Sequence, residues 1–239
     1  MVEKTNEITL HYIAEASAII ALWSIIAWGI YRIGAGFSFG ILPFIVMGVI
    51  VGYLAADFLS GLVHWFADRY GSPHTPIVGS TFITPFREHH ADPKDITRVD
   101  FIMTNGHNSM ITIPVLLLFN LLPVEGGTWW AMLIFVSGLS LSVWGFATNQ
   151  FHKWAHVDSP PKLARPFQKI GLFLHEDEHN KHHSYPNDSH YCITSGVLNG
   201  FLEKIQFWVF MEKMMLRVFN ARPFHDDDME NHIPLAPSK

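Results

Sequence analysis

The chain has 239 residues, of which 49% are hydrophobic and only 15% are charged, and its formal net charge is −5. It is more apolar than an ordinary soluble domain, and its mean hydropathy of +0.19 indicates a membrane protein. The negative net charge argues against a nucleic-acid-binding surface. Cys192 is the only cysteine, which excludes an internal disulfide and a cysteine-based zinc or iron–sulfur site. Any metal must be bound by nitrogen or oxygen, and the sequence contains fifteen histidines.

Four uncharged stretches are long enough, or nearly so, to cross a membrane as helices, because about 20 helical residues span the hydrocarbon core. No basic segment with a cleavage site precedes the first stretch, so we expect no cleaved signal peptide. The sequence therefore predicts membrane-spanning helices over residues 12–31, 33–56, 108–124 and 126–151.

The basic residues predict the orientation. If both helical hairpins cross the membrane and return, all but Arg32 of the sixteen basic residues lie on one face. Lysines and arginines are retained on the cytoplasmic side, so we expect both termini in the cytoplasm. On this face, residues 57–107 and the residues after 150 together hold every histidine except His11, which lies near the N-terminus. Residues 197–219 are apolar but interrupted by charges, which favours a helix lying in the membrane interface.

These features predict an all-α integral membrane protein with one domain over residues 1–239. Four transmembrane helices would carry a cytoplasmic, histidine-rich helical cap that holds a di-metal site.

Eight histidines form four clusters on the cap side. Histidines at i and i+4 lie one above the other on a helix and can share an ion, whereas adjacent histidines splay about 100° apart and can serve two ions. Eight imidazoles divided between two metals give four each and leave positions open for water or dioxygen. Imidazole suits iron, copper and zinc, and two irons is the interpretation that uses every cluster. The eight candidate ligands are His64, His89, His90, His152, His156, His179, His182 and His183.

Three acids near these clusters are candidates for orienting the metal-bound imidazoles, namely Asp57, Asp68 and Glu88. Asp57 falls within or near the bilayer, where an ionisable group is costly without a role or a partner. The alternative for Asp57 is an ion pair with Arg69 or Arg87.

Residues 175–179 read His-Glu-Asp-Glu-His and match the H-E-x-x-H pattern of zinc metalloproteases. A membrane protease would bury this pattern in an apolar helix, whereas here it is expected in a polar loop and leaves the other clusters without a role. A metal transporter would place polar ligands at the bilayer midplane, where three of the four stretches offer almost none. Both are lower-ranked alternatives.

Five motifs occur in chain order: ADFLSGLVHW from residue 56, PFREHHADP from 85, TNQFHKWAH from 148, HNKHH from 179 and YCIT from 191. In these motifs the sequence resembles the plasmanylethanolamine desaturase family, also called Kua-type or CarF-like. The resemblance implies a four-span di-iron desaturase whose histidine ligands fall on the same eight positions. The positions that depart from the family pattern are His107, His175, Asn187 and His190.

The resemblance also implies the reaction. Two hydrogens would leave C1 and C2 of the sn-1 O-alkyl chain of a plasmanylethanolamine, giving the vinyl ether of a plasmalogen while dioxygen becomes water. The family includes a plastid branch that desaturates phosphatidylglycerol, so a fatty-acyl desaturase acting on that lipid is the alternative. The expected membrane is the endoplasmic reticulum in a eukaryote or the cytoplasmic membrane in a bacterium.

The expected electron donor is cytochrome b5 or a ferredoxin-type protein. Its candidate docking residues are Lys153, Lys162, Arg165, Lys169 and Lys181. The candidate residues for the lipid headgroup are Arg98, Asn105 and Asn108.

Overall fold

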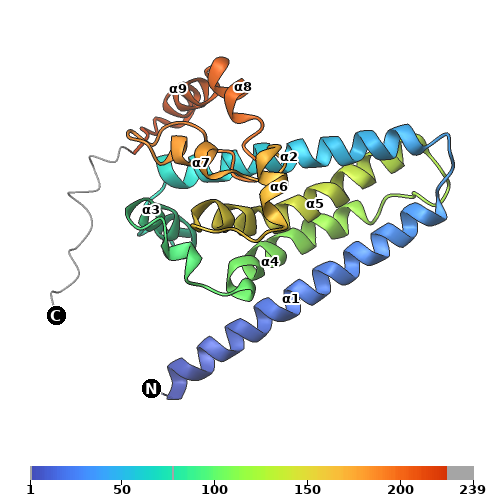
Figure 1. Ribbon diagram of the computed structural model, residues 1–239, viewed down its shortest axis with the longest axis horizontal. Helices are drawn as coiled ribbons and strands as arrows, with labels where there is room; N and C mark the ends of the chain where they lie inside the picture. Colours follow the sequence, from blue (N-terminus) through green and yellow to red (C-terminus); the bar gives the residue numbers. More distant parts are fainter. Residues whose placement is uncertain (1, 77, 225–239) are drawn as a thin grey trace.

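The computed structural model describes residues 2–76 and 78–224, and every regular element in these residues is helical. Four long helices lie side by side, and five short ones gather toward the end opposite the two interhelical turns (Figure 1). The long helices are α1 (Val2–Ala35), α2 (Leu42–Arg69), α4 (Phe101–Phe119) and α5 (Trp129–His156). The short helices are α3 (Thr84–Ala91), α6 (Ala164–Lys169), α7 (Glu176–His182), α8 (Asn199–Lys204) and α9 (Phe207–Phe219). Residues 225–239, which the single-domain and terminus predictions include, lie outside the described residues.

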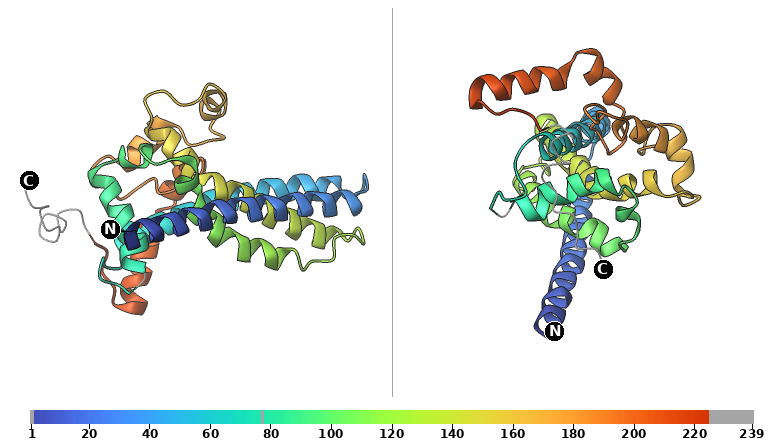
Figure 2. Two further views of the ribbon diagram at one scale, coloured as in Figure 1. Left: turned by 90° about the horizontal axis from the view of Figure 1, so that it is seen from below. Right: turned by 90° about the vertical axis from the view of Figure 1, so that its left-hand side faces the viewer.

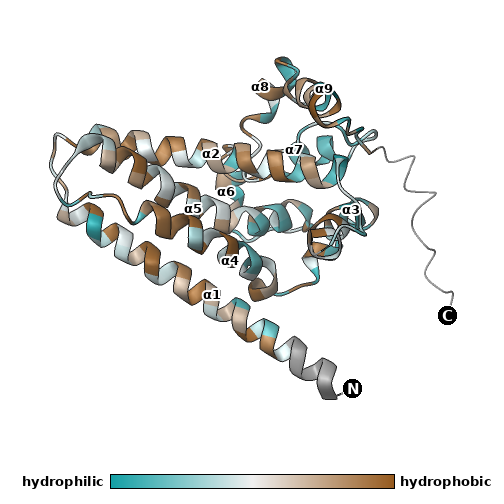
Figure 3. Ribbon diagram, turned by 180° about the vertical axis from the view of Figure 1, so that it is seen from behind, coloured by the Kyte–Doolittle hydropathy of each residue, from teal (hydrophilic) through white to brown (hydrophobic). Residues whose placement is uncertain are grey.

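Three segments are long and apolar enough to cross a membrane, namely Thr9–Ala35, Leu42–Arg69 and Trp129–His156. Helix α4 has 19 residues and packs against α1 and α5. Its first turns are polar, and they contain Asn105, His107 and Asn108. Apolar positions dominate the long helices, whereas polar positions gather at the end that carries the short helices (Figure 3). The described residues therefore form a helical bundle with three candidate spans and a fourth long helix beside them.

The second predicted span, 33–56, is displaced along the chain. Residues 36–41 form the turn, and α2 begins at Leu42 with Pro43 in its first turn, where the missing N–H removes no hydrogen bond. A Cβ atom on Gly36 would lie 2.1 Å from the carbonyl oxygen of Val124, so this close approach requires glycine. The helix also extends beyond the predicted limit of the span at residue 56, because α2 continues through the buried Asp57 to Arg69.

The third and fourth spans also have different limits from those predicted. Helix α4 begins at Phe101 because the carboxylate of Asp100 caps it, accepting the backbone N–H groups of Ile102 and Met103 at 2.9 and 3.0 Å. The helix ends at Phe119, so residues 120–124 belong to the turn after α4 rather than to a span. Helix α5 continues to His156, as expected for a helix that carries two histidines beyond the fourth stretch. The first predicted span lies wholly inside α1.

The predicted interfacial helix over residues 197–219 is two helices. Gln206 has a left-handed backbone with φ of 54°, which separates α8 from α9. Helix α9 lies across the direction of the bundle (Figure 2). Its exposed apolar side chains are Val209, Phe210, Leu216, Val218 and Phe219. The amphipathic character expected of the whole segment therefore belongs to α9.

Arg32 binds the turn between α4 and α5 at the end opposite the short helices. Its guanidinium lies 2.5 Å from the Oε1 atom of Glu125 and donates to the carbonyl oxygens of Asn120 and Leu122 at 2.5 and 2.6 Å. A buried guanidinium needs such partners, since an unpaired charge in an apolar environment is costly. This contact fastens α1 to the turn.

Glycines allow α2 and α5 to approach closely. A Cβ atom on Gly52 would lie 2.3 Å from the carbonyl oxygen of Ser137 and 2.7 Å from the backbone nitrogen of Leu141. Ser140 of α5 also donates to the carbonyl oxygen of Val49 at 2.8 Å. The pair of helices is therefore held in a fixed register, and that register sets how their histidine-bearing ends meet.

Gly52→Ala should lower the free energy of unfolding by about 1–3 kcal/mol, because the added methyl group meets backbone atoms that cannot rotate away. The measurement is the thermal unfolding midpoint of the purified protein in detergent. Gly145→Ala is the matched control, since nothing lies within 4 Å of its added Cβ. Equal midpoints for the two variants would contradict the close α2–α5 packing.

Candidate metal centre

The eight predicted histidines lie together where the ends of α2 and α5 meet α3 and α7, and they form two groups with Asp68. The candidate ligand atoms within each group lie within 4.8 Å of one another. The five-histidine group consists of His89, His152, His156, His179 and His183. The Asp68 group consists of His64, Asp68, His90 and His182. The expected division of four imidazoles to each metal is therefore replaced by five and by three with a carboxylate.

The Nε2 atoms of the five-histidine group converge. His156 Nε2 lies 3.2 Å from that of His152 and 2.8 Å from that of His179, and His183 Nε2 lies 3.0 Å from that of His179. Ligands that each lie ~2.1 Å from one ion are separated by roughly 3 Å, so these spacings suit a shared cation. Helical i,i+4 spacing in α5 supplies one pair, and α7 supplies His179 with His183 directly after it.

The Asp68 group is arranged around one carboxylate oxygen. Asp68 Oδ2 lies 3.3 Å from His64 Nε2 and 3.4 Å from the Nε2 atoms of both His90 and His182. His64 and His182 are completely buried, and Asp68 is 8% exposed. One negative charge thus faces three imidazoles in a site from which water is largely excluded.

The Nδ1 atoms of two histidines in this group contact backbone carbonyl oxygens. His64 Nδ1 lies 3.1 Å from the oxygen of Tyr191, and His182 Nδ1 lies 2.8 Å from that of Ser189. A carbonyl oxygen only accepts, so Nδ1 carries the hydrogen, and a neutral ring then has a lone pair at Nε2. These lone pairs point at a carboxylate oxygen, which is also an acceptor. A cation between them is the arrangement that removes the repulsion.

Three imidazoles outside the long helices are held neutral. Burial, reinforced by neighbouring His156, lowers the pKa of His89 to about 2. Burial and the neighbouring His152 keep the pKa of His179 well below its usual range, and burial together with His182 lowers the pKa of His183. Neutral imidazole is the form that binds a metal.

Several buried polar atoms of the two groups have no hydrogen-bond partner among the described residues. They include the Nε2 atoms of His64 and His89, the Nδ1 atom of His179 and both carboxylate oxygens of Asp68. Buried polar atoms are normally paired, so unpartnered acceptors that face other ligand atoms within each group indicate a place where a cation would bind. Nitrogen ligands with one carboxylate fit a transition metal such as iron.

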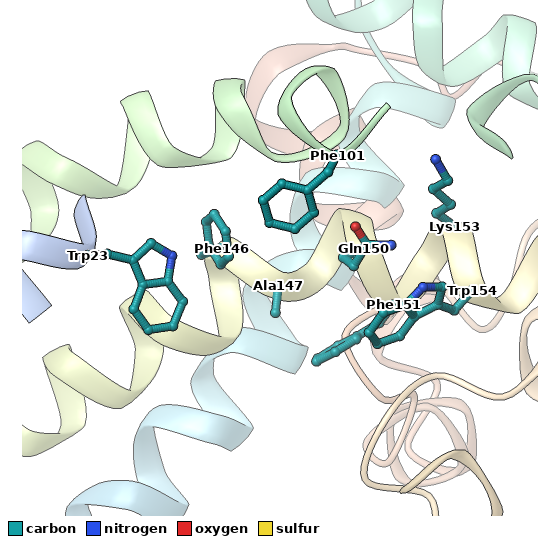
Figure 4. Close-up of a pocket in the computed structure, with 8 residues that line it drawn as sticks. All are labelled: Trp23, Phe101, Phe146, Ala147, Gln150, Phe151, Lys153 and Trp154. Carbon is teal, nitrogen blue, oxygen red and sulfur yellow. The ribbon is translucent and has the colours of Figure 1, made fainter. Parts of the chain in front are cut away.

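An open apolar cleft of about 530 Å³ flanks the α5 turn that carries His152 (Figure 4). Its aromatic walls come from α1, α4 and α5, and Gln150 and Lys153 are its polar members. The lining residues are Trp23, Phe101, Phe146, Ala147, Gln150, Phe151, Lys153 and Trp154. The cleft therefore offers a mainly apolar surface close to, but not including, the histidines.

The lipid desaturase domain family matches residues 53–226, a range that includes both groups of ligands. The chain belongs to the lipid desaturase family. It is 40% identical over 213 residues to plasmanylethanolamine desaturase of Myxococcus xanthus, covering 89% of this chain and 75% of the relative. It is 41% identical over 199 residues to plasmanylethanolamine desaturase 1 of Mus musculus, covering 77% and 70%.

Chloroplastic fatty acid desaturase 4 of Arabidopsis thaliana is 36% identical over 179 residues, covering 72% of this chain and 52% of the relative. No solved structure matches the chain. The resemblance seen in the sequence motifs is confirmed. This lipid desaturase is an integral membrane oxidoreductase.

Asp57 of the desaturase contacts backbone rather than an imidazole. Its Oδ1 accepts the N–H groups of Ser195 and Gly196 at 2.8 and 2.9 Å, and its Oδ2 accepts that of Leu198 at 3.1 Å. The alternative ion pairs are not formed either, because Arg69 pairs with Glu212 at 2.9 Å and Arg87 donates to backbone carbonyls. Asp57 thus fixes the segment that follows Tyr191.

The other predicted supporting acids differ in position. Asp68 lies among the candidate ligand atoms, although it was predicted as an acid that supports a metal-bound imidazole. Glu88 is exposed on α3 and belongs to neither group. The two backbone carbonyls of Tyr191 and Ser189 were missed, because a carbonyl leaves no trace in side-chain identity. The one available signal was their position: Ser189 lies just before the YCIT motif, and Tyr191 is the first residue of that motif.

The candidate headgroup residues have partners within the protein. Arg98 pairs with Asp92 at 2.8 Å and with Asp95 at 3.0 Å, and all three are exposed. Asn105 donates to Gln150 at 3.1 Å, whereas Asn108 donates to the carbonyl oxygen of Gly145 at 3.1 Å. The two asparagines therefore join α4 to α5. Contact of any of the three with a headgroup stays a prediction.

The H-E-x-x-H pattern does not form a zinc-binding pair of histidines. His175 is the N-cap of α7, and its Nδ1 accepts the backbone N–H of Asp177 at 3.2 Å. Its side chain is 42% exposed, while His179 is buried in the five-histidine group. The expected polar loop is a short helix from Glu176, and its capping places the two histidines in different surroundings.

Asp68→Asn should remove metal from the Asp68 group while the five-histidine group keeps its own. The amide keeps the shape of the carboxylate but loses the negative charge, and the affinity at this position should fall at least about tenfold. Elemental analysis of the purified protein measures the metal per chain. Glu88→Gln is the matched control and should retain the wild-type content; equal metal in Asp68→Asn and the wild type would contradict a ligand role.

Proposed function

We propose that this desaturase converts plasmanylethanolamine into the corresponding plasmalogen by forming the vinyl ether bond of the sn-1 chain. The observation that carries the proposal is the convergence of eight imidazoles, six of them from buried residues, and one buried carboxylate inside the matched lipid desaturase domain. The relatives that bear the name of this activity are 40% and 41% identical and cover most of the chain. The fatty acid desaturase 4 relative is less similar and aligns over only 52% of its own length.

The reaction explains why such a ligand set is needed. A saturated C1–C2 unit loses two hydrogen atoms, and dioxygen takes these with two further electrons and two protons to give two molecules of water. An unactivated C–H bond resists acid–base chemistry, so two irons bound by these residues would supply the redox chemistry. The five-histidine group would hold one ion and the Asp68 group the other. No cysteine is required in this assignment.

The membrane arrangement follows from the same proposal. Helix α4 would complete a four-span base, and the whole chain 1–239 would form one desaturase domain with both termini in the cytoplasm. The ligand-bearing ends of α2 and α5 would then face the cytoplasm together with the short helices. Helix α9 would lie in the interface with its apolar side chains in the lipid. The membrane would be the endoplasmic reticulum in a eukaryote and the cytoplasmic membrane in a bacterium.

Cytochrome b5 or a ferredoxin-type protein would supply the two external electrons. Of the five basic residues expected to dock it, Lys153 donates to the carbonyl oxygen of Val99 and Lys181 pairs with Glu178 at 2.5 Å. Lys162, Arg165 and Lys169 lie on or beside α6 and are exposed. An acidic donor would therefore meet this part of the cap first.

Expression of the wild-type chain in a host without plasmalogens should yield vinyl ether ethanolamine lipid, and only when dioxygen is present. Lipid mass spectrometry with acid hydrolysis identifies the vinyl ether. An empty vector and an anaerobic culture are the controls. Appearance of an unsaturated acyl chain on phosphatidylglycerol, without vinyl ether, would replace the proposed substrate by that lipid.

Alanine at each of the eight ligand histidines should abolish vinyl ether formation, because an imidazole that is lost leaves an iron without one of its few ligands. His175→Ala and Glu176→Gln should retain activity, since neither residue belongs to a metal group. The assay is the same lipid analysis at matched protein levels. Loss of function in His175→Ala and Glu176→Gln, with activity kept in His152→Ala, would instead support the zinc protease alternative.

A further inference from the structure

A third cluster of metal-ligating side chains lies between α1 and α4, separate from both groups of the desaturase centre. His11 and Glu15 are one turn apart on α1, and His107 faces them from α4. Glu15 Oε1 lies 2.8 Å from His107 Nδ1 and 3.3 Å from His11 Nε2. The two imidazole rings have centroids 5.1 Å apart. Three potential ligand atoms therefore lie within 4.8 Å of one another.

The carboxylate of the cluster is buried, and its two imidazoles are exposed. Glu15 is only 3% exposed, whereas the side chains of His11 and His107 are 57% and 55% exposed. A Cβ atom on Gly106 would lie 2.4 Å from the Cβ atom of Glu15, so α4 leaves space for this side chain with a glycine. A carboxylate buried between two helices is costly unless it meets positive charge or hydrogen-bond donors. The exposed imidazoles can supply that charge only when they are protonated or when they bind a cation.

We propose that His11, Glu15 and His107 bind one divalent metal ion of the zinc class, with a remaining position open to water. Two imidazoles and one carboxylate are a set that zinc accepts with a fourth, open position. Ligands ~2.0–2.2 Å from a zinc ion are separated by roughly 3–4 Å, so the 3.3 Å contact of Glu15 with His11 has this spacing, and the 2.8 Å contact with His107 needs only a small widening. Cysteine is not needed, and the two imidazoles lie at the surface of the helical bundle.

The position of the cluster means that a bound ion would hold α1 against α4. The N-terminal part of α1 extends away from the rest of the bundle (Figures 1 and 2). The cluster joins α1 to α4 where α1 leaves the bundle, at the end opposite the contact made by Arg32. A metal bound there fastens α1 at a second point and adds its binding free energy to the folded state. The site is independent of the chemistry proposed for the desaturase centre.

The test uses the iron-loaded, full-length protein in detergent, kept anaerobic and dialysed against Zn²⁺. Elemental analysis should find one more zinc per chain in the wild type than in His107→Ala or Glu15→Gln, with iron per chain unchanged in all three. Loss of one ligand should weaken zinc binding at least about tenfold in a calorimetric titration. Zn²⁺ should also raise the unfolding temperature of the wild type more than that of either variant.

His74→Ala is the matched control, because it removes an exposed histidine that belongs to none of the three clusters. It should bind zinc as the wild type does. Glu15→Gln keeps the size of the buried side chain, and the retained iron reports that both variants are folded. Equal zinc content in the wild type and both variants would overturn the proposal, and so would zinc uptake that only displaces iron. Either result would leave the cluster as an ion pair between α1 and α4.

Discussion

The structure depends on the burial of acceptor atoms that face one another. Asp68 Oδ2 lies 3.3–3.4 Å from three imidazole nitrogens, and the rings of His64 and His182 are oriented by hydrogen bonds at Nδ1 that leave lone pairs toward this carboxylate. In a site of low dielectric such an arrangement is unfavourable without positive charge. The short helices therefore pack around a candidate cation-binding centre, and its candidate ligands are part of the core rather than of the surface.

The long helices and one buried carboxylate position this centre together. Close contact at Gly52 fixes α2 against α5, so that His64 and His152 come from adjacent helix ends. Asp57 then accepts three backbone N–H groups of residues 195–198. That contact holds the preceding segment, whose carbonyl oxygen at Tyr191 orients His64. Asp57, two helical turns before the candidate ligand His64, thus acts on it through the backbone. The three N–H groups also explain how a buried acid is tolerated in this helix.

The sequence was informative wherever local spacing carries the geometry. The i,i+4 pair His152 and His156 and the helical bundle follow from periodicity and apolar length, and all eight candidate histidines lie together in the structure. The limits of the helices were less predictable. Helix α2 continues through Asp57, and the backbone N–H groups that bind the carboxylate of Asp57 are 138 or more residues away in the chain. Gln206 separates two helices in residues 197–219, where the composition of the segment favoured one helix. The role of Asp68 also required tertiary information, since i+4 spacing from His64 fits a ligand and a supporting acid equally.

The division into five imidazoles and three imidazoles with a carboxylate makes the two candidate metal positions chemically different. Neutral rings contribute no formal charge, whereas Asp68 contributes one negative charge to its group. If the two ions had the same charge, the two groups of ligands with their ions would differ in net charge. The position beside Asp68 would be the better one for a more highly charged ion. Because His90 in one group directly follows His89 in the other, a single turn of α3 couples the two positions. The asymmetry is thus built into adjacent residues, and it distinguishes this centre from a pair of equivalent four-histidine sites.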